Sequence, residues 1–277
     1  MEFEAIGTHW WIESALADEQ INRVHTLLEK IDKTWSRFRD DSMVMTMSQM
    51  VGEYPLSKPD VALLNWYHRL FEATDGLVTP LIGQTMSDAG YDQHYSLQPK
   101  SKINKTPDWD KVIKLGEQSI TIKQPWLIDV GAAGKGYAVD RVAELLGDDY
   151  CVDASGDIKV GGRKMKIGLE DPRDPSKLIG VASIQNESIC GSAVNRRAWG
   201  DWHHVINPKS SSPVSDIIAT WVISDNAMQA DGLATALFFV APAKLQHLAP
   251  FRYCIMYKDG GIKMTNDKTI TIFTEDK

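Results

Sequence analysis

The stretch LIDVGAAGKGYAVDRVAELL, residues 127–146, constrains the fold more than any other part of the chain. Its first residues are apolar and predict a buried strand, and the periodic apolar residues of 137–146 predict an amphipathic helix. Gly131, Gly134 and Gly136 lie between the two, at a predicted strand-to-helix turn. Such a turn suits phosphate, because a helix N-terminus presents free backbone N–H groups. A tight turn that needs positive φ angles is the alternative interpretation of the same spacing.

The remaining elements follow from hydrophobic periodicity and turn residues. Residues 77–110 show little periodicity and predict a long loop, a kind of segment that is often functional. Strands and helices mix without regular alternation, so we expect an α+β fold rather than a doubly wound sheet. The expected helices are 18–32, 59–74 and 226–240, and the expected strands are 3–12, 126–130, 252–257 and 269–273, with a hairpin within 111–130 and mainly strands from 150 to 223.

Length, charge and cysteine content exclude several classes of protein. A chain of 277 residues can bury a real core, and we expect residues 1–277 to form a single domain. The net charge of −7 argues against a nucleic-acid binder. No apolar run reaches the roughly 18 residues of a membrane span, and the N-terminus lacks the features of a signal peptide. The three cysteines match neither a disulfide framework nor a zinc site. We therefore expect a reduced, cytoplasmic protein.

Two further segments carry candidate chemistry. Asp231 lies in a predicted helix of small apolar residues, with Thr235 one turn further on the same face. A buried carboxylate needs a cation or several donors, and oxygen ligands suit Mg²⁺; a capping or solvated acid is the alternative. His204 ends a predicted strand next to His203. With an ordinary pKa of roughly 6 to 7 it would act as a base or bind phosphate, whereas a solvated imidazole is the alternative.

Seven segments occur in the order found in one enzyme family, and the chain resembles the ApbE-type FAD:protein FMN transferases over about residues 3–260. The segments are EAIGTHW, TWSRFRDDS, TPLIGQTMSDAGYD, IDVGAAGKGYAVDRVAELL, DASGDIKVGG, HHVINP and AMQADGLATALFFV. The resemblance implies an ApbE-like α+β fold, with mixed or antiparallel sheets and flanking helices in two closely packed lobes. It also implies Mg²⁺-dependent transfer of the FMN half of FAD to a Thr or Ser hydroxyl of a target protein, with release of AMP. Hydrolysis of FAD to FMN and AMP, or FAD binding without catalysis, are the alternatives.

The resemblance also implies roles for individual residues. The catalytic residues would be His204 and Asp231. Mg²⁺ would be bound by the carbonyl oxygen of Ala132 and the side chains of Asp231 and Thr235, with Ala234 adjacent. FAD would contact Ile6, Phe38, Ala89, Gly90, Tyr91, Asp129, Lys135 and Ile206.

Several positions depart from the family pattern. The aspartate before a proline is Thr79, the aspartate of the H-I-I-D-P segment is Asn207, and the segment S-G-D-Y-R reads SAVNRR at 192–197. An aromatic position is Ala89, which removes a stacking surface. The core of the expected FAD and metal site is retained, and the changes lie at the rim of the site. They predict a different acceptor protein, or a protein that binds or hydrolyses FAD without modifying a partner.

Overall fold

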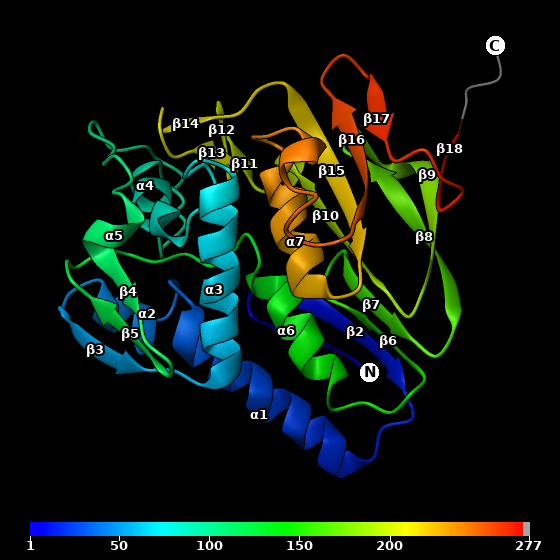
Figure 1. Ribbon diagram of the computed structural model, residues 1–277, viewed down its shortest axis with the longest axis horizontal. Helices are drawn as coiled ribbons and strands as arrows, with labels where there is room; N and C mark the ends of the chain where they lie inside the picture. Colours follow the sequence, from blue (N-terminus) through cyan, green and yellow to red (C-terminus); the bar gives the residue numbers. More distant parts are fainter. Residues whose placement is uncertain (274–277) are drawn as a thin grey trace.

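An eight-stranded antiparallel sheet organises the molecule (Figure 1). The computed structural model describes residues 1–273. One face of the sheet carries helices α6 (Gly134–Ala143) and α7 (Ala227–Ala236). The sheet runs in the order β1 (Glu2–Ala5), β2 (Thr8–Ser14), β6 (Tyr150–Asp153), β7 (Asp157–Gly161), β10 (Ser188–Ala193), β15 (Ile217–Ser224), β16 (Arg252–Tyr257) and β17 (Ile262–Met264).

The central strand β15 is buried on both faces. Its Val222 packs in the core beneath the helices, and Thr220 Oγ1 donates to the Ala234 carbonyl of α7 at 2.7 Å. Its Trp221 and Ile223 belong to a second core on the opposite face. A three-stranded sheet covers that face, formed by β8 (Lys164–Asp171), β9 (Asp174–Gln185) and β18 (Ile270–Ile272). Burial on both faces explains why the strand reads as a nearly continuous apolar run.

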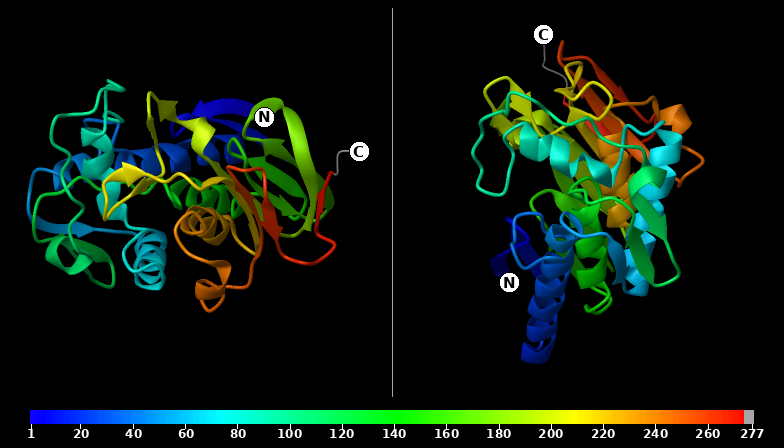
Figure 2. Two further views of the ribbon diagram at one scale, coloured as in Figure 1. Left: turned by 90° about the horizontal axis from the view of Figure 1, so that it is seen from above. Right: turned by 90° about the vertical axis from the view of Figure 1, so that its left-hand side faces the viewer.

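Two longer helices form the next layer, α1 (Asp18–Trp35) and α3 (Lys58–Ala73). The left view of Figure 2 shows α3 and α7 end-on and side by side. Ser57 begins α3 with a capping box, in which its hydroxyl oxygen accepts from the Asp60 amide. Buried Asp60 also accepts from Trp35 Nε1 at 2.9 Å and from Tyr137 Oη at 3.0 Å, so one carboxylate joins α1, α3 and α6.

The contact between α6 and α7 is unusually close at Gly136. A Cβ atom on Gly136 would lie 2.1 Å from the Ala227 carbonyl oxygen and 2.8 Å from Asp231 Cβ. The Asp140 carboxylate of α6 accepts from the amides of Ala227 and Met228 at 3.0 and 2.9 Å, so it caps the N-terminus of α7. Only glycine at position 136 allows the two backbones to approach this closely.

Shorter elements complete the fold around these layers. The sheet β3 (Gly52–Pro55), β5 (Ser119–Ile122) and β4 (Ile113–Leu115) lies at the left of Figure 1. The others are α2 (Met43–Met47), η1 (Pro80–Ile82), α4 (Gly83–Asp88), α5 (Trp109–Val112), η2 (Val194–Arg196), β11 (Ala198–Trp199), β12 (Trp202–His203), β13 (Ile206–Asn207), β14 (Ser212–Pro213) and η3 (Pro242–Lys244).

The predicted α+β class with antiparallel sheets is confirmed, and so are the helices α1, α3 and α7, the strands β16 and β18, and the β4–β5 hairpin. The single strand predicted for 3–12 is wrong, because Ile6 and Gly7 turn it into the β1–β2 hairpin with φ angles of 51° and 66°. The long loop predicted for 77–110 contains η1, α4 and α5. Their few residues give too short a periodic pattern to predict a helix.

The glycine stretch lacks the strand predicted before it and the positive φ angles of the tight-turn interpretation, while phosphate binding at this turn stays a prediction. Residues 126–130 form no strand, because this extended segment packs along η1 instead of a sheet and Asp129 N donates to the Pro80 carbonyl at 2.8 Å. Helix α6 begins at Gly134, so two of the glycines lie in its first turn. None of Gly131, Gly134 and Gly136 has a positive φ angle. Close helix packing, most severe at Gly136, therefore explains the glycine there better than turn geometry does.

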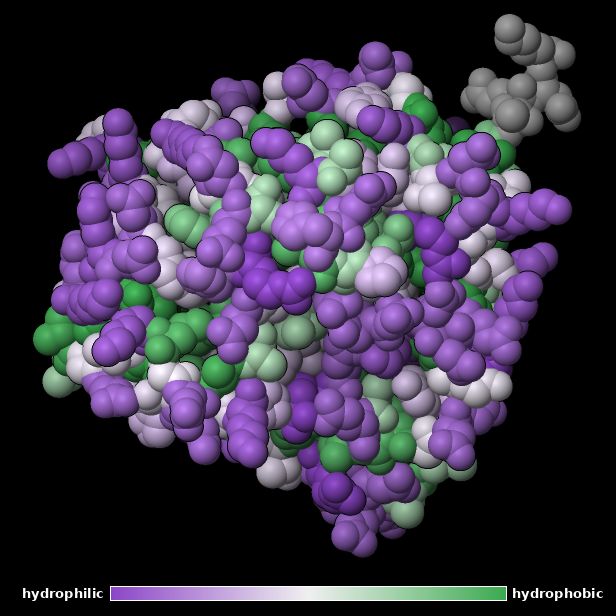
Figure 3. Space-filling view, viewed as in Figure 1, coloured by the Kyte–Doolittle hydropathy of each residue, from purple (hydrophilic) through white to green (hydrophobic). Residues whose placement is uncertain are grey.

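Hydrophilic side chains cover most of the face shown in Figure 3, and hydrophobic ones lie between them in small groups. No helix within residues 1–273 is long and apolar enough to cross a membrane.

We expect Gly136→Ala to destabilise the protein by about 2 kcal/mol, because the added methyl group overpacks the α6–α7 contact. The free energy of unfolding, measured by urea denaturation, tests this expectation. Gly147→Ala is the matched control, since a Cβ atom there meets nothing within 4 Å. Equal free energies of unfolding for the two variants would show that α6 and α7 can move apart without loss of stability.

Candidate active site

A cavity of about 740 Å³ opens where the end of α1, the segment 129–135, the β11–β12 hairpin and α7 meet. Ten of the residues predicted from the sequence line it, although they come from distant parts of the chain. They are Ile6, Phe38, Tyr91, Asp129, Ala132, Lys135, His204, Ile206, Asp231 and Thr235. The fold therefore brings most of the predicted site together around one space.

Three predicted site residues lie behind the cavity wall. Ala89 accepts a hydrogen bond from Trp199 Nε1 at 3.0 Å through its carbonyl oxygen. Gly90 has a φ angle of 101°, and its carbonyl oxygen accepts from the Leu97 amide at 2.8 Å. Ala234 is fully buried in α7. These contacts support the wall, and direct contact of the three residues with a ligand stays a prediction.

Asp129 is bonded within the protein. Its carboxylate forms an ion pair with Arg37 Nε and accepts from the Gly131 amide at 2.6 Å. Burial opposes the charged form, but the Arg37 guanidinium and these hydrogen bonds hold the pKa of Asp129 below its usual value. Asp129 is thus an ionised anchor for the glycine segment. The amide of Gly134 is also used internally, since it donates to the Val130 carbonyl at 2.7 Å.

Lys135 points to a buried acid. Its Nζ atom lies 2.9 Å from Asp157 Oδ2 and donates to the Ala154 carbonyl at 3.3 Å. Burial alone would lower the pKa of Lys135, but the charges of Asp157 and Asp231 raise it above its ordinary value. Asp157 is completely buried at the start of β7. Lys135 therefore neutralises a buried carboxylate beside the cavity, so its charge is already matched.

Asp231 differs from Asp32 and Asp129, the other acids that line the cavity, because no cation among residues 1–273 pairs with it. Its side chain is 4% exposed, and Oδ2 accepts from the Gly136 amide at 3.0 Å. Among residues 1–273 no basic side chain forms an ion pair with it. Burial, and then the negative charge of Asp157, raise the pKa of Asp231 well above its usual value. A cation at this position would favour the charged form.

The donor set around Asp231 fits Mg²⁺. Thr235 lies one turn further along α7, and its Oγ1 atom is 3.5 Å from the Ala132 carbonyl oxygen. A carboxylate, a hydroxyl and a carbonyl are hard oxygen ligands. No group of three or more His, Cys, Asp or Glu that could hold a metal occurs within residues 1–273. Mg²⁺ tolerates this small protein set, because it keeps water ligands and binds substrate phosphates.

Aromatic rings form one wall of the cavity. Phe38 and Tyr95 stack with centroids 5.1 Å apart and an interplanar angle of 10°. Tyr91 stacks on Trp199 at 5.6 Å and 23°. The Trp199 indole donates a hydrogen bond to the Ala89 carbonyl and lines the cavity. It therefore places an aromatic ring next to Ala89. The stacking surface expected to be lost at Ala89 is thus provided from the β11–β12 hairpin.

The two histidines have different environments. His203 is fixed in the fold, since Nε2 lies 2.8 Å from the Val214 carbonyl oxygen and Nδ1 accepts from the Val205 amide at 3.2 Å. His204 lines the cavity, and its Nδ1 atom is buried without a hydrogen-bond partner from the described residues. Burial, and then the charge of Arg197, lower the pKa of His204 to about 3. The ordinary pKa of roughly 6 to 7 expected from the sequence is therefore wrong.

Two departures from the family pattern have structural roles. Thr79 is buried, and its hydroxyl oxygen accepts from the Leu81 amide at 3.2 Å to begin η1. Asn207 Oδ1 accepts from the Lys209 amide at 2.9 Å in the turn after β13. Both side chains satisfy backbone groups that an aspartate could also satisfy. These two changes therefore leave the local backbone intact.

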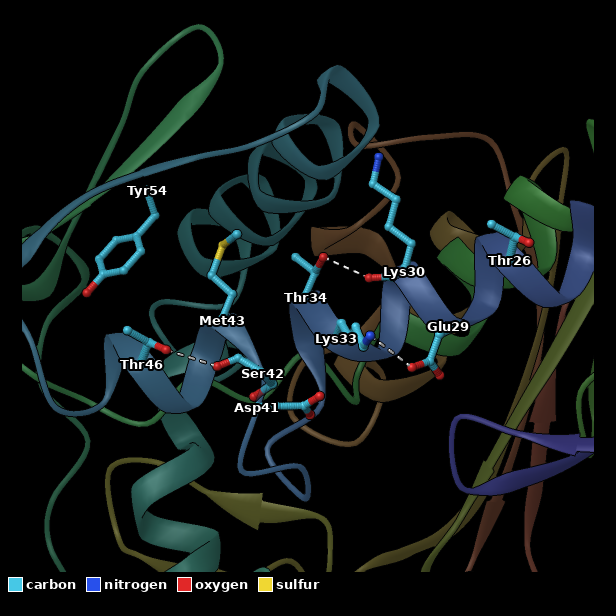
Figure 4. Close-up of a pocket in the computed structure, with 10 residues that line it drawn as sticks. All are labelled: Thr26, Glu29, Lys30, Lys33, Thr34, Asp41, Ser42, Met43, Thr46 and Tyr54. Atoms are coloured by element: carbon cyan, nitrogen blue, oxygen red, sulfur yellow. Dashed lines mark hydrogen bonds and ion pairs between the residues drawn. The ribbon is translucent and has the colours of Figure 1, made fainter.

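A second hollow lies on the outer side of α1 and is separate from this cavity (Figure 4). Within it Lys33 pairs with Glu29, Thr34 Oγ1 donates to the Lys30 carbonyl, and Thr46 Oγ1 donates to the Ser42 carbonyl. None of the predicted site residues lines it. We assign no site to this hollow.

Sequence reasoning missed four side chains at or beside the cavity, Arg37, Asp157, Arg197 and Trp199. Arg37 is 2% exposed, and its Nη1 atom donates to the Tyr91 carbonyl at 2.6 Å. Its guanidinium carbon lies 4.2 Å from the centroid of the Phe38 ring. Arg37 lies in the segment TWSRFRDDS and Asp157 in DASGDIKVGG, two of the segments that resemble the family. Their charge next to apolar residues could have marked them as site residues. Arg197 and Trp199 stand in or just after a segment that departs from the family.

Solved structures of ApbE proteins have the same fold as this chain. The ApbE protein of Thermotoga maritima has a TM-score of 0.83 at 20% identity, over 96% of both chains. The flavin transferase ApbE from Vibrio cholerae has a TM-score of 0.77 at 19% identity, over 97% of this chain and 96% of that one. The ApbE family model matches residues 6–254, and this chain belongs to the ApbE family.

Curated relatives in that family carry the name FAD:protein FMN transferase. One from Klebsiella pneumoniae is 25% identical, over 78% of this chain and 74% of the relative. Another from Haemophilus influenzae is 24% identical, over 98% of this chain and 84% of the relative. The predicted family and the predicted enzyme class, a transferase, are therefore confirmed.

We expect His204 to stay neutral between pH 8 and pH 5, because its pKa lies near 3 in the folded protein. NMR titration of the imidazole signals, assigned with a His204→Asn variant, measures this directly. The same histidine in urea should titrate near the usual value of roughly 6.5. Stability linked to His204 is accordingly present above that value and is lost as the pH falls toward 3. A midpoint above pH 6 in the folded protein would contradict the assigned environment.

Proposed function

We propose that this chain transfers the FMN half of FAD to a Thr or Ser hydroxyl of a target protein and releases AMP, as a single domain over residues 1–277. The observation that carries the proposal is the buried, unpaired carboxylate of Asp231 beside Thr235 and the Ala132 carbonyl, in a large cavity with an aromatic wall. FAD carries both aromatic rings and phosphates, and the curated relatives are named FAD:protein FMN transferase.

The reaction exchanges one phosphorus–oxygen bond for another. The hydroxyl oxygen of the acceptor forms a bond to the phosphorus of the FMN half. The phosphoanhydride bond to the AMP half breaks, and AMP leaves with the bonding electrons. The hydroxyl proton passes to a base. Such a transfer depends mainly on positioning and on stabilising charge on the phosphate oxygens.

His204 is our candidate for that base. Its unpartnered Nδ1 atom and its position at the cavity suit a group that accepts a proton. The neutral ring is available at all pH values well above 3. A bound phosphate places negative charge nearby and raises the pKa of the imidazole, which offsets burial and makes proton transfer more favourable.

Asp231, Thr235 and the Ala132 carbonyl are our candidates for holding Mg²⁺. When bound, the ion neutralises negative charge on phosphate oxygens. Gly136 keeps the Asp231 carboxylate oriented through its amide. The Tyr67 hydroxyl accepts from the Ala133 amide at 3.1 Å and so fixes the loop that presents the Ala132 carbonyl. The aromatic wall of Phe38, Tyr91 and Trp199 is our candidate surface for the rings of FAD, together with Ile6 and Ile206.

The products formed from FAD and Mg²⁺ test this function. We expect AMP from chromatography, and flavin bound covalently to peptides from a library that contains Thr and Ser. AMP together with free FMN, and no flavinylated peptide, would indicate hydrolysis of FAD instead. FAD binding without any AMP would leave only a flavin-binding role. The cytoplasmic location stays a prediction from the sequence.

We expect Asp231→Asn to lower the rate of AMP release by at least about 100-fold, because it removes the one charged ligand proposed for the metal. The amide side chain keeps an oxygen acceptor for the Gly136 amide, so the fold is preserved. Asp225→Asn is the control, since this exposed acid lies just before α7. Equal rates for the two variants would remove Asp231 from the metal site.

A further inference from the structure

The cavity pairs nearly all of its charged side chains internally. Five basic residues line it, and four of them have a carboxylate partner. The pairs are Arg37 with Asp129, Arg39 with Asp32 at 3.0 Å, Lys135 with Asp157 at 2.9 Å, and Arg196 with Glu170 at 3.2 Å. The fifth is Arg197, whose side chain forms no ion pair or hydrogen bond with residues 1–273.

Arg197 is held next to the candidate base. Its carbonyl oxygen accepts from the His204 amide at 3.1 Å, at the base of the β11–β12 hairpin. Both residues line the cavity, and Arg197 is half-buried. The preceding residue, Arg196, is exposed and already paired with Glu170. These two arginines are adjacent in the sequence, but only Arg196 has a counterion among residues 1–273.

We propose that Arg197 binds the diphosphate of the ligand, so that it is a further binding residue of the transfer site. An unpaired cation facing a cavity favours an anion, and a guanidinium binds phosphate oxygens through two parallel hydrogen bonds. Asp231 lines the same cavity, and its carboxyl group has no cationic partner among residues 1–273. A ligand that carries both a diphosphate and an associated divalent cation complements the two unmatched charges at once. This proposal rests on the proposed function, because it takes FAD as the ligand.

Comparing FAD with riboflavin separates phosphate recognition from ring recognition. Dissociation constants are measured from flavin fluorescence in EDTA, which excludes the metal and metal-dependent turnover. We expect Arg197→Ala to weaken FAD binding by about 10- to 100-fold, the usual effect of losing hydrogen bonds to a charged group. Riboflavin has no phosphate, so its affinity should change by less than about twofold. Arg197→Lys should recover part of the FAD affinity, because it keeps the charge without the planar pair of donors.

Arg196→Ala is the matched control, since it removes the neighbouring arginine that already has a partner. It should leave FAD affinity within about twofold. Thermal unfolding of each variant establishes that the fold is retained, and Arg197→Gln replaces Arg197→Ala if the latter does not fold. Equal effects of the Arg196 and Arg197 variants on FAD would overturn the proposal. So would an equal loss of riboflavin affinity. Failure of the unaltered protein to bind FAD both in EDTA and with Mg²⁺ would instead overturn the proposed function itself.

Discussion

The close contact between α6 and α7 at Gly136 is the constraint on which the rest of the site depends. With no side chain at this position, the Gly136 amide reaches the Asp231 carboxylate, and a Cβ atom would collide with the Ala227 carbonyl. The Asp140 carboxylate then caps α7 from α6. Because α6 follows directly after the loop that carries Ala132, this one contact sets the distance between that carbonyl and Thr235. Close packing at Gly136 thus positions the Asp231 carboxyl group and the Ala132 carbonyl oxygen at the cavity.

Internal ion pairs leave few charged side chains of the cavity without a counterion. Most acids and bases around it neutralise one another, and they hold α1, β7 and the glycine segment in place. An unmatched buried charge is costly, so a fold retains one mainly where a ligand or metal supplies the counterion. Asp231 and Arg197 both line this cavity, and neither has an ion-pair partner among residues 1–273. Ligands that carry a single charge, or none, leave at least one of them unsatisfied.

At three positions that depart from the family pattern, the structure shows local contacts that other side chains supply. Ala89 has no ring, but the indole of Trp199 bonds to its carbonyl and stacks on Tyr91 beside it. An aromatic surface can therefore be supplied from a segment more than one hundred residues away in sequence. Thr79 and Asn207 replace aspartates and still accept hydrogen bonds from nearby amides. Position-by-position comparison of sequences misses such substitutions, because equivalent atoms come from different residues.

The sequence by itself determined the elements whose signal is local. Helical spacing of apolar residues predicted α1, α3 and α7, and placed Asp231 and Thr235 on one face of α7. Residues 126–130 were predicted wrongly as a strand, because an extended apolar run becomes a strand only if a neighbour completes its hydrogen bonds. Only the tertiary structure decided that Arg37 pairs with Asp129, 92 positions along the chain. It also decided the low pKa of His204, since burial and the Arg197 charge set that value, and burial by distant segments cannot be read from local sequence.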